Sequence, residues 1–171
     1  GANATGRPYT TFTFQVEDDG GTHHGGAPLD PAPDTMTINV TPLIVTAFAP
    51  TPSGFVVQFS GELMRAGLNL YDGAGGTLGE ADVILKDGSG NVVAGSIVVA
   101  ADGQAIEFVA TGGVLAPGTY TVTFRSGATG FRDLDGDPLD GDNNGTTGDD
   151  YTTSFPVASS TNRVVSIPDM A

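Results

Sequence analysis

The absences in this sequence of 171 residues already restrict its function. It has no cysteine and no tryptophan, and 6 lysines and arginines stand against 20 aspartates and glutamates. Without cysteine, disulfides, zinc–thiolate sites and thiol nucleophiles are excluded. Nucleic acid and anionic membranes are excluded as partners, because both require clustered positive charge. No stretch approaches the roughly 20 apolar residues that span a bilayer, so membrane insertion is excluded as well.

The residues that are abundant favour a β-rich protein with an acidic surface. There are 26 glycines and 11 prolines, which predict many turns and no long helices. Apolar residues make up 39% of the chain, enough for a core, and the net charge is −14. A divalent cation is the natural partner of clustered carboxylates. The N-terminus lacks the charged and apolar regions of a signal peptide, and we expect the chain to be a piece of a longer protein.

Residues 1–42 contain two segments in which apolar and polar residues alternate. The first is Tyr9-Thr-Thr-Phe-Thr-Phe-Gln-Val16 and the second is Thr35-Met-Thr-Ile-Asn-Val40. Alternation at period two predicts half-buried strands. Two strands make a hairpin, and an isolated hairpin is marginal in water. We therefore interpret 1–42 as the end of a preceding, truncated repeat that could also pack on the main domain or on a neighbouring chain.

Residues 43–158 carry the pattern of a complete domain. About seven short strands occur between residues 43 and 157, with turn residues every ten to fifteen positions. Asp87-Gly-Ser-Gly90 predicts a hairpin turn between strands at 83–86 and 91–99, and Glu62 to Leu70 is the one helical candidate. The sequence predicts an all-β fold, an immunoglobulin-like β-sandwich. Residues 159–171 are expected to link it to a following module.

An acidic stretch near the end of this domain is the most informative motif. Seven aspartates lie between 133 and 150 without a lysine or arginine among them, and folding such a loop compactly needs a counter-charge. Asp140, Asp142, Asn144 and Gly145 match the first half of an EF-hand loop, but position twelve is Tyr151 instead of glutamate. Asp149 or Asp150 would have to complete the coordination. The sequence predicts a Ca²⁺ site, with a solvated acidic loop as the alternative. The candidate ligands are Asp133, Asp135, Asp137, Asp140, Asp142, Asn144, Asp149 and Asp150.

The other candidate sites favour no catalytic function. His23 and His24 are adjacent in a glycine-rich stretch, so they would point to opposite sides of an extended chain. No Gly-x-Ser-x-Gly motif occurs, and none of the four glutamates forms a glycosidase-like motif with a second acid. Asp18, Asp19, Asp30 and Asp34 form a second acidic group for which ordinary turn roles are favoured. We expect this chain not to be an enzyme.

Two parts of the chain resemble known bacterial families. Phe12-Thr-Phe-Gln-Val-Glu-Asp-Asp-Gly-Gly21 together with Thr35-Met-Thr-Ile-Asn-Val-Thr41 resembles the last two strands of bacterial cadherin-like repeats. Residues 43–157 resemble the bacterial Ig-like domains described in S-layer proteins. The matching segments are Pro52-Ser-Gly-Phe-Val-Val-Gln-Phe59, Leu68-Asn-Leu-Tyr-Asp72, Leu115-Ala-Pro-Gly-Thr-Tyr-Thr-Val122 and Leu139-Asp-Gly-Asp-Asn-Asn-Gly145.

The resemblance implies a repeat module in a long secreted or cell-surface protein. It implies calcium at 133–150, neighbouring repeats as partners, and roles in adhesion to a cell-surface protein or polysaccharide. Because a fold does not determine a function, two alternatives stay open. One is a carbohydrate- or other ligand-binding module, for which Tyr71 beside the glycine-rich loop is the residue to test. The other is an accessory domain of a secreted enzyme.

Overall fold

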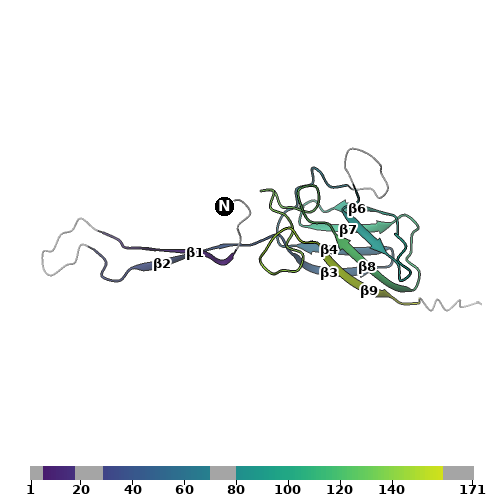
Figure 1. The fold of residues 1–171 in the computed structure, drawn as a ribbon, viewed down its shortest axis with the longest axis horizontal. Coiled ribbons are helices and arrows are strands. Elements are labelled where there is room, and N and C mark those ends of the chain that lie inside the picture. Colours follow the sequence, from purple (N-terminus) through teal and green to yellow (C-terminus); the bar gives the residue numbers. More distant parts are fainter. Residues whose placement is uncertain (1–5, 18–28, 70–79, 160–171) are drawn as a thin grey trace, which may run out of the picture.

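The computed structural model describes residues 6–17, 29–69 and 80–159, and this part of the chain is built of strands and loops (Figure 1). The expected all-β class is confirmed. No helix among the described residues is long and apolar enough to cross a membrane. The nine strands are β1 (Gly6–Phe14), β2 (Asp34–Val40), β3 (Val45–Thr51), β4 (Gly54–Phe59), β5 (Val83–Lys86), β6 (Gly95–Val99), β7 (Ala105–Ala110), β8 (Gly118–Phe124) and β9 (Tyr151–Val157).

The first two strands form a two-stranded antiparallel sheet that extends away from the other seven (Figure 1). Phe12 is paired with Met36, and Thr11 with Thr37. Because cross-strand partners lie on the same side of a sheet, the alternating sequence gives this hairpin one apolar and one polar face.

The remaining strands form the two sheets of a β-sandwich. One sheet has the order β3-β4-β7-β6 and the other β5-β8-β9, all antiparallel. When β3 to β9 are lettered A to G, these orders are A-B-E-D and C-F-G. This is the strand order of the constant-type immunoglobulin fold, so the predicted sandwich is confirmed in its topology.

A cluster of phenylalanines fills the space between the two sheets. Phe55 of β4 stacks on Phe108 of β7, with ring centroids 5.2 Å apart. Phe55 also meets Phe124 of β8 and Phe155 of β9 edge-on, across the sandwich. These four side chains are buried, and they belong to one continuous core. Stacked and edge-on aromatic rings thus form the centre of this core, in a sequence that has no cysteine or tryptophan.

A tyrosine corner fixes the start of β8. The buried Tyr120 donates a hydrogen bond of 2.9 Å from its hydroxyl to the carbonyl oxygen of Ala116, four residues upstream. Its ring stacks on Phe155 with a centroid distance of 5.7 Å. A tyrosine near the start of strand F that bonds back to the preceding corner is a hallmark of immunoglobulin-like sandwiches.

One local prediction was wrong, and a second is confirmed only in part. Residues 62–69 form no helical turn. Instead Leu63 makes an isolated bridge to Asp133, and Leu68 is buried beyond a turn at Gly67, whose φ is +112°. The segments around Asp87-Gly-Ser-Gly90 begin as a hairpin, with a bridge between Lys86 and Val92, but the chain then crosses to the other sheet. There β6 pairs with β7, while β5 pairs with β8.

Candidate metal centre

The acidic stretch connects β8 to β9 and lies at the end of the sandwich where the hairpin joins (Figure 1). Two buried side chains anchor it. Phe131 is fully buried and stacks on Phe59 at 5.5 Å, and Leu139 is fully buried as well. The amide of Asp140 donates to the carbonyl oxygen of Leu43, two residues before β3, at 2.9 Å. The loop is therefore attached both to the core and to the residues that lead in from the hairpin.

Three of the predicted ligands converge in this loop. One carboxylate oxygen from each of Asp140, Asp142 and Asp149 lies within 4.8 Å of the other two. Asp140 and Asp149 form a parallel bridge, and the amide of Gly141 donates to the carbonyl oxygen of Asp149 at 3.2 Å. These backbone contacts bring the two ends of the segment together and so place the distant Asp149 beside the other two.

A glycine is required at position 141 by this close approach. A Cβ atom at Gly141 would lie 2.2 Å from the backbone carbonyl carbon of Asp150. Asn143 has a φ of 57° and Gly145 a φ of 89°, both in the left-handed region. Glycine and asparagine are the residues that adopt this region at low cost, so the Asp-Asn-Asn-Gly sequence is matched to the turn it forms.

Backbone amides hold the three carboxylates in place. Asp140 accepts from the amides of Asn144 at 3.0 Å and Gly145 at 2.8 Å, one on each oxygen. Asp142 accepts from the amide of Asn144 at 3.1 Å, and Asp149 from the amide of Asp142 at 2.9 Å. A carboxylate oxygen has two lone pairs, so each of these oxygens keeps acceptor capacity for a cation.

The donor set fits calcium. Calcium takes 6–8 oxygen ligands at about 2.3–2.6 Å, so ligand atoms on opposite sides of the ion are about 5 Å apart. The spread of 4.8 Å among the three oxygens lies within that limit. Asp140 is 1% exposed, and the one ion pair among the described residues is Arg125–Glu80, so no basic side chain of this part neutralises the three charges. All three groups are hard anionic oxygens, as calcium prefers.

The other five predicted ligands have different partners. Asp150 accepts from the amide of Ser126 at 2.8 Å. The side-chain oxygen of Asn144 accepts from the amide of Thr146 at 2.7 Å, and its amide group donates to Asp142. Asp133 accepts from the amides of Asp135 and Asp137 and closes a separate turn. Burial, followed by the nearby charges of Asp133 and Asp135, raises the pKa of Asp137.

Several other candidates are placed by the structure or lie outside it. Asp30 accepts from the amide of Ala32 at 3.0 Å, which is a turn role. Asp87 accepts from the amides of Ser89 and Asn91 in the loop after β5. The residues that fall outside the described part are Asp18, Asp19, His23, His24, Tyr71 and Asp72.

Sequence reasoning missed a buried acid beside the glycine-rich segment. Asp82 is 1% exposed and accepts from the amide of Asn69 at 2.6 Å. Burial raises the pKa of Asp82, while the Asn69 amide and the charge of Arg125 act in the opposite direction. The only sequence signal was its position immediately before the apolar strand Val83–Lys86.

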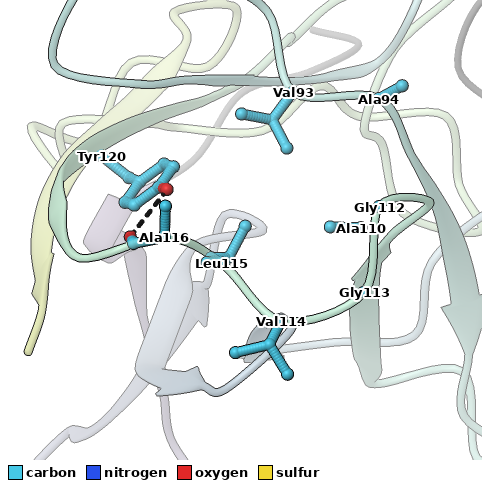
Figure 2. A pocket seen from close by; sticks show the side chains of 9 residues that line it. All are labelled: Val93, Ala94, Ala110, Gly112, Gly113, Val114, Leu115, Ala116 and Tyr120. Atoms are coloured by element: carbon cyan, nitrogen blue, oxygen red, sulfur yellow. Dashed lines mark hydrogen bonds between the residues drawn. The ribbon is translucent and has the colours of Figure 1, made fainter. Parts of the chain in front are cut away.

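An apolar cavity lies near the tyrosine corner (Figure 2). It has a volume of about 250 Å³, and in Figure 2 Val93 faces Leu115 across the opening. The Tyr120 hydroxyl is engaged with Ala116 on one side of it. The lining residues are Val93, Ala94, Ala110, Gly112, Gly113, Val114, Leu115, Ala116 and Tyr120. None of them is charged, so this cavity offers no acid, base or metal ligand.

Comparison with known proteins gives structural likeness only. No protein-family model and no curated protein matches the sequence. The chain is similar to the solved structure of domains 1–6 of the surface layer protein SbsC, with 15% identity over 70% of this chain and a TM-score of 0.49. It is also similar to a crystal structure of the S-layer protein rSbsC(31-844), with 16% identity over 69% of this chain and a TM-score of 0.47. The match spans 14% of each of those chains.

Proposed function

We propose that this chain is a non-catalytic structural module of a secreted or cell-surface protein, and that calcium bound at Asp140, Asp142 and Asp149 stabilises it. The observation that carries the proposal is the convergence of these three carboxylates within 4.8 Å, with Asp140 almost fully buried. A buried carboxylate that has no basic partner is costly, and a bound divalent cation would offset that cost.

Calcium at this position would hold three segments of the domain together. Asp149 lies two residues before β9, and Asp142 lies in the turn that follows Leu139. The amide of Asp140 is bonded to Leu43, and Ser60 contacts both sides of Leu43 by accepting from the amide of Ile44 and donating to the carbonyl oxygen of Pro42. Ordering the loop would thus also order the connection between hairpin and sandwich.

An extracellular setting is supported by the chemistry of such a site. Extracellular calcium modules bind with dissociation constants of about 10⁻⁴–10⁻³ M, which suits a site with three carboxylates and a partly exposed rim. The resemblance of residues 43–157 to bacterial Ig-like domains supports the same location. In this role the chain acts as a rigid, acidic spacer between neighbouring repeats, and it positions adhesive or enzymatic modules without doing chemistry itself.

Thermal unfolding with and without calcium tests the proposal. If the dissociation constant is about 10⁻⁴ M, calcium at about a hundred times that concentration adds roughly 2.7 kcal/mol to the stability of the folded state. For a domain of this size that corresponds to a rise in Tm of about 8–15 °C relative to the chelated protein. Magnesium should give a smaller rise, because it retains its waters.

Two variants in the same loop separate calcium binding from the loss of charge. Asp142→Asn removes a converging ligand, whereas Asp135→Asn removes one negative charge from the neighbouring turn. We expect Asp142→Asn to abolish most of the calcium-dependent rise and Asp135→Asn to retain it. Equal loss in both variants, or no rise with calcium in the unmodified chain, would refute the assignment of the site.

A further inference from the structure

The acidic loop contains the only Asn–Gly pair of the sequence, Asn144–Gly145. Asparagine is chemically labile in this context, because the backbone nitrogen of the following residue can attack the side-chain amide. A glycine in the second position puts no side chain in the way of this attack. Both residues are exposed, so water reaches them. Whether the reaction proceeds therefore depends on the hydrogen bonds that hold the pair.

Three hydrogen bonds oppose the reaction in the folded loop. The attacking nitrogen of Gly145 donates its proton to the buried carboxylate of Asp140 at 2.8 Å. The side chain of Asn144 is held at both of its polar atoms, since Oδ1 accepts from the amide of Thr146 at 2.7 Å and Nδ2 donates to Asp142 at 2.9 Å. Ring closure must turn this side chain until its Cγ atom meets the nitrogen of Gly145. All three bonds are lost in that movement.

We propose that Asn144 is a site of spontaneous deamidation, and that the closed loop suppresses the reaction until the loop opens. The nitrogen of Gly145 gives up its proton to water and forms a bond to Cγ of Asn144. The bond from Cγ to Nδ2 breaks, and the amide group takes up a proton and leaves as ammonia. Water then opens the resulting succinimide ring at either carbonyl, which yields aspartate or isoaspartate. Water is the only co-reactant.

The size of the protection follows from the bonds that must open. Three hydrogen bonds of ordinary net strength keep such a loop closed about 99% of the time, so the reaction should be roughly a hundredfold slower than in the unfolded chain. This protection requires no metal. It is a property of the loop itself and can be measured in chelator.

Calcium should add to this protection, an expectation that rests on the proposed function. Asp140 and Asp142, which hold the Asn–Gly pair, are two of the three proposed ligands. If calcium binds only the closed loop, calcium at about a hundred times its dissociation constant lowers the open population by roughly a further hundredfold. Asn144 would then be modified chiefly in molecules that have lost their calcium.

The modification cannot be reversed by restoring calcium. Both products replace the amide donor to Asp142 by a carboxylate, in a stretch that already has seven aspartates and no lysine or arginine between 133 and 150. Isoaspartate also inserts a methylene group into the backbone before Gly145, so the bond from its amide to Asp140 cannot form in the same turn. The loop thus records the time that the module has spent without calcium.

Peptide mass spectrometry of the full chain tests the proposal in three incubations at one mildly alkaline pH. These are unfolded in urea with chelator, folded in chelator, and folded with calcium, and the readout is the exchange of the Asn144 amide for a hydroxyl. Asn91, which is followed by the β-branched Val92, is the internal control and should stay unmodified. We expect a rate about a hundredfold lower in the second incubation than in the first, and a further large decrease with calcium.

The two parts of the expectation fail in different ways. Equal rates in urea and in the folded, chelated protein would overturn the proposal. Protection in chelator without further slowing by calcium would support the deamidation site and would instead contradict the calcium site on which the proposed function rests.

Two variants measured in chelator connect the protection to the observed contacts. Asp142→Ala removes the carboxylate that holds the Asn144 side chain and should accelerate deamidation by about tenfold. The control Asp135→Ala removes a carboxylate of the neighbouring turn and should leave the rate unchanged. The same rate in Asp142→Ala as in the control would refute the role of these bonds.

Discussion

The tyrosine corner allows a clean measurement of one hydrogen bond, through the substitution Tyr120→Phe. The Tyr120 hydroxyl donates to the Ala116 carbonyl oxygen at 2.9 Å, and its buried ring stacks on Phe155. Phenylalanine keeps the ring and the stacking and removes only the hydroxyl. The effect therefore reports the bond itself and leaves the aromatic core in place.

The expected loss is about 1 kcal/mol of unfolding free energy. A hydrogen bond of this kind contributes about 0.5–1.5 kcal/mol net, and more only if the partner is left buried without water. Ala116 is exposed, so its carbonyl oxygen can turn to solvent in the variant. In a domain of this size the loss lowers Tm by about 4 °C.

Urea unfolding in chelator measures this loss, with Tyr151→Phe as the matched control. Tyr151 is partly buried and stacks on Phe124 at 5.5 Å, but its hydroxyl makes no hydrogen bond with another described residue. The control should therefore change the stability by less than about 0.5 kcal/mol. Both variants should retain the denaturant m-value, since the surface exposed on unfolding is unchanged. A Tyr120→Phe effect no larger than that of the control would refute the stabilising role of the corner.

Two further predictions concern the core and a buried acid. Gly95→Ala should destabilise the sandwich by about 1–3 kcal/mol in denaturant unfolding, because a Cβ atom there would lie 2.2 Å from the ring of the buried Phe108. In the control Gly112→Ala, the new Cβ atom meets nothing within 4 Å, so the stability should change little. The substitution Asp82→Asn tests whether the stability depends on the ionisation of this buried acid. Because burial raises the pKa of Asp82 in the folded state, the ionised carboxylate lowers the stability of the fold at pH values above that pKa. This destabilisation is lost as the pH falls through the folded-state pKa and Asp82 becomes protonated. Relative to Asp82→Asn, the unmodified protein should gain stability on acidification, and parallel stability–pH curves would contradict this.

Strand positions could be predicted well, because apolar and polar residues alternate along a strand that is buried on one side of its sheet. In β8, Tyr120, Val122 and Phe124 alternate with threonines, and all three are buried as predicted. The same local pattern does not identify which strand lies beside which. β5 and β6 follow one another through a short turn, but β6 pairs with β7, and this choice depends on contacts between distant segments. The apolar residues between Glu62 and Leu70 suggested a helix, but Leu63 and Leu68 are buried from an irregular segment.

The acidic loop shows why its candidate ligands could be recognised as a group and not individually. Aspartates at alternate positions can accept from backbone amides two residues on, as Asp133 does from Asp135, or can point together at a cation. The alternating pattern is identical in the two cases. What distinguishes Asp140 and Asp142 from Asp133 and Asp135 is the bridge to Asp149, which adds a third carboxylate from the far end of the loop. That bridge depends on the bond from Asp140 to Leu43 and on the absence of a side chain at Gly141, so the site depends on tertiary contacts as much as on its own motif.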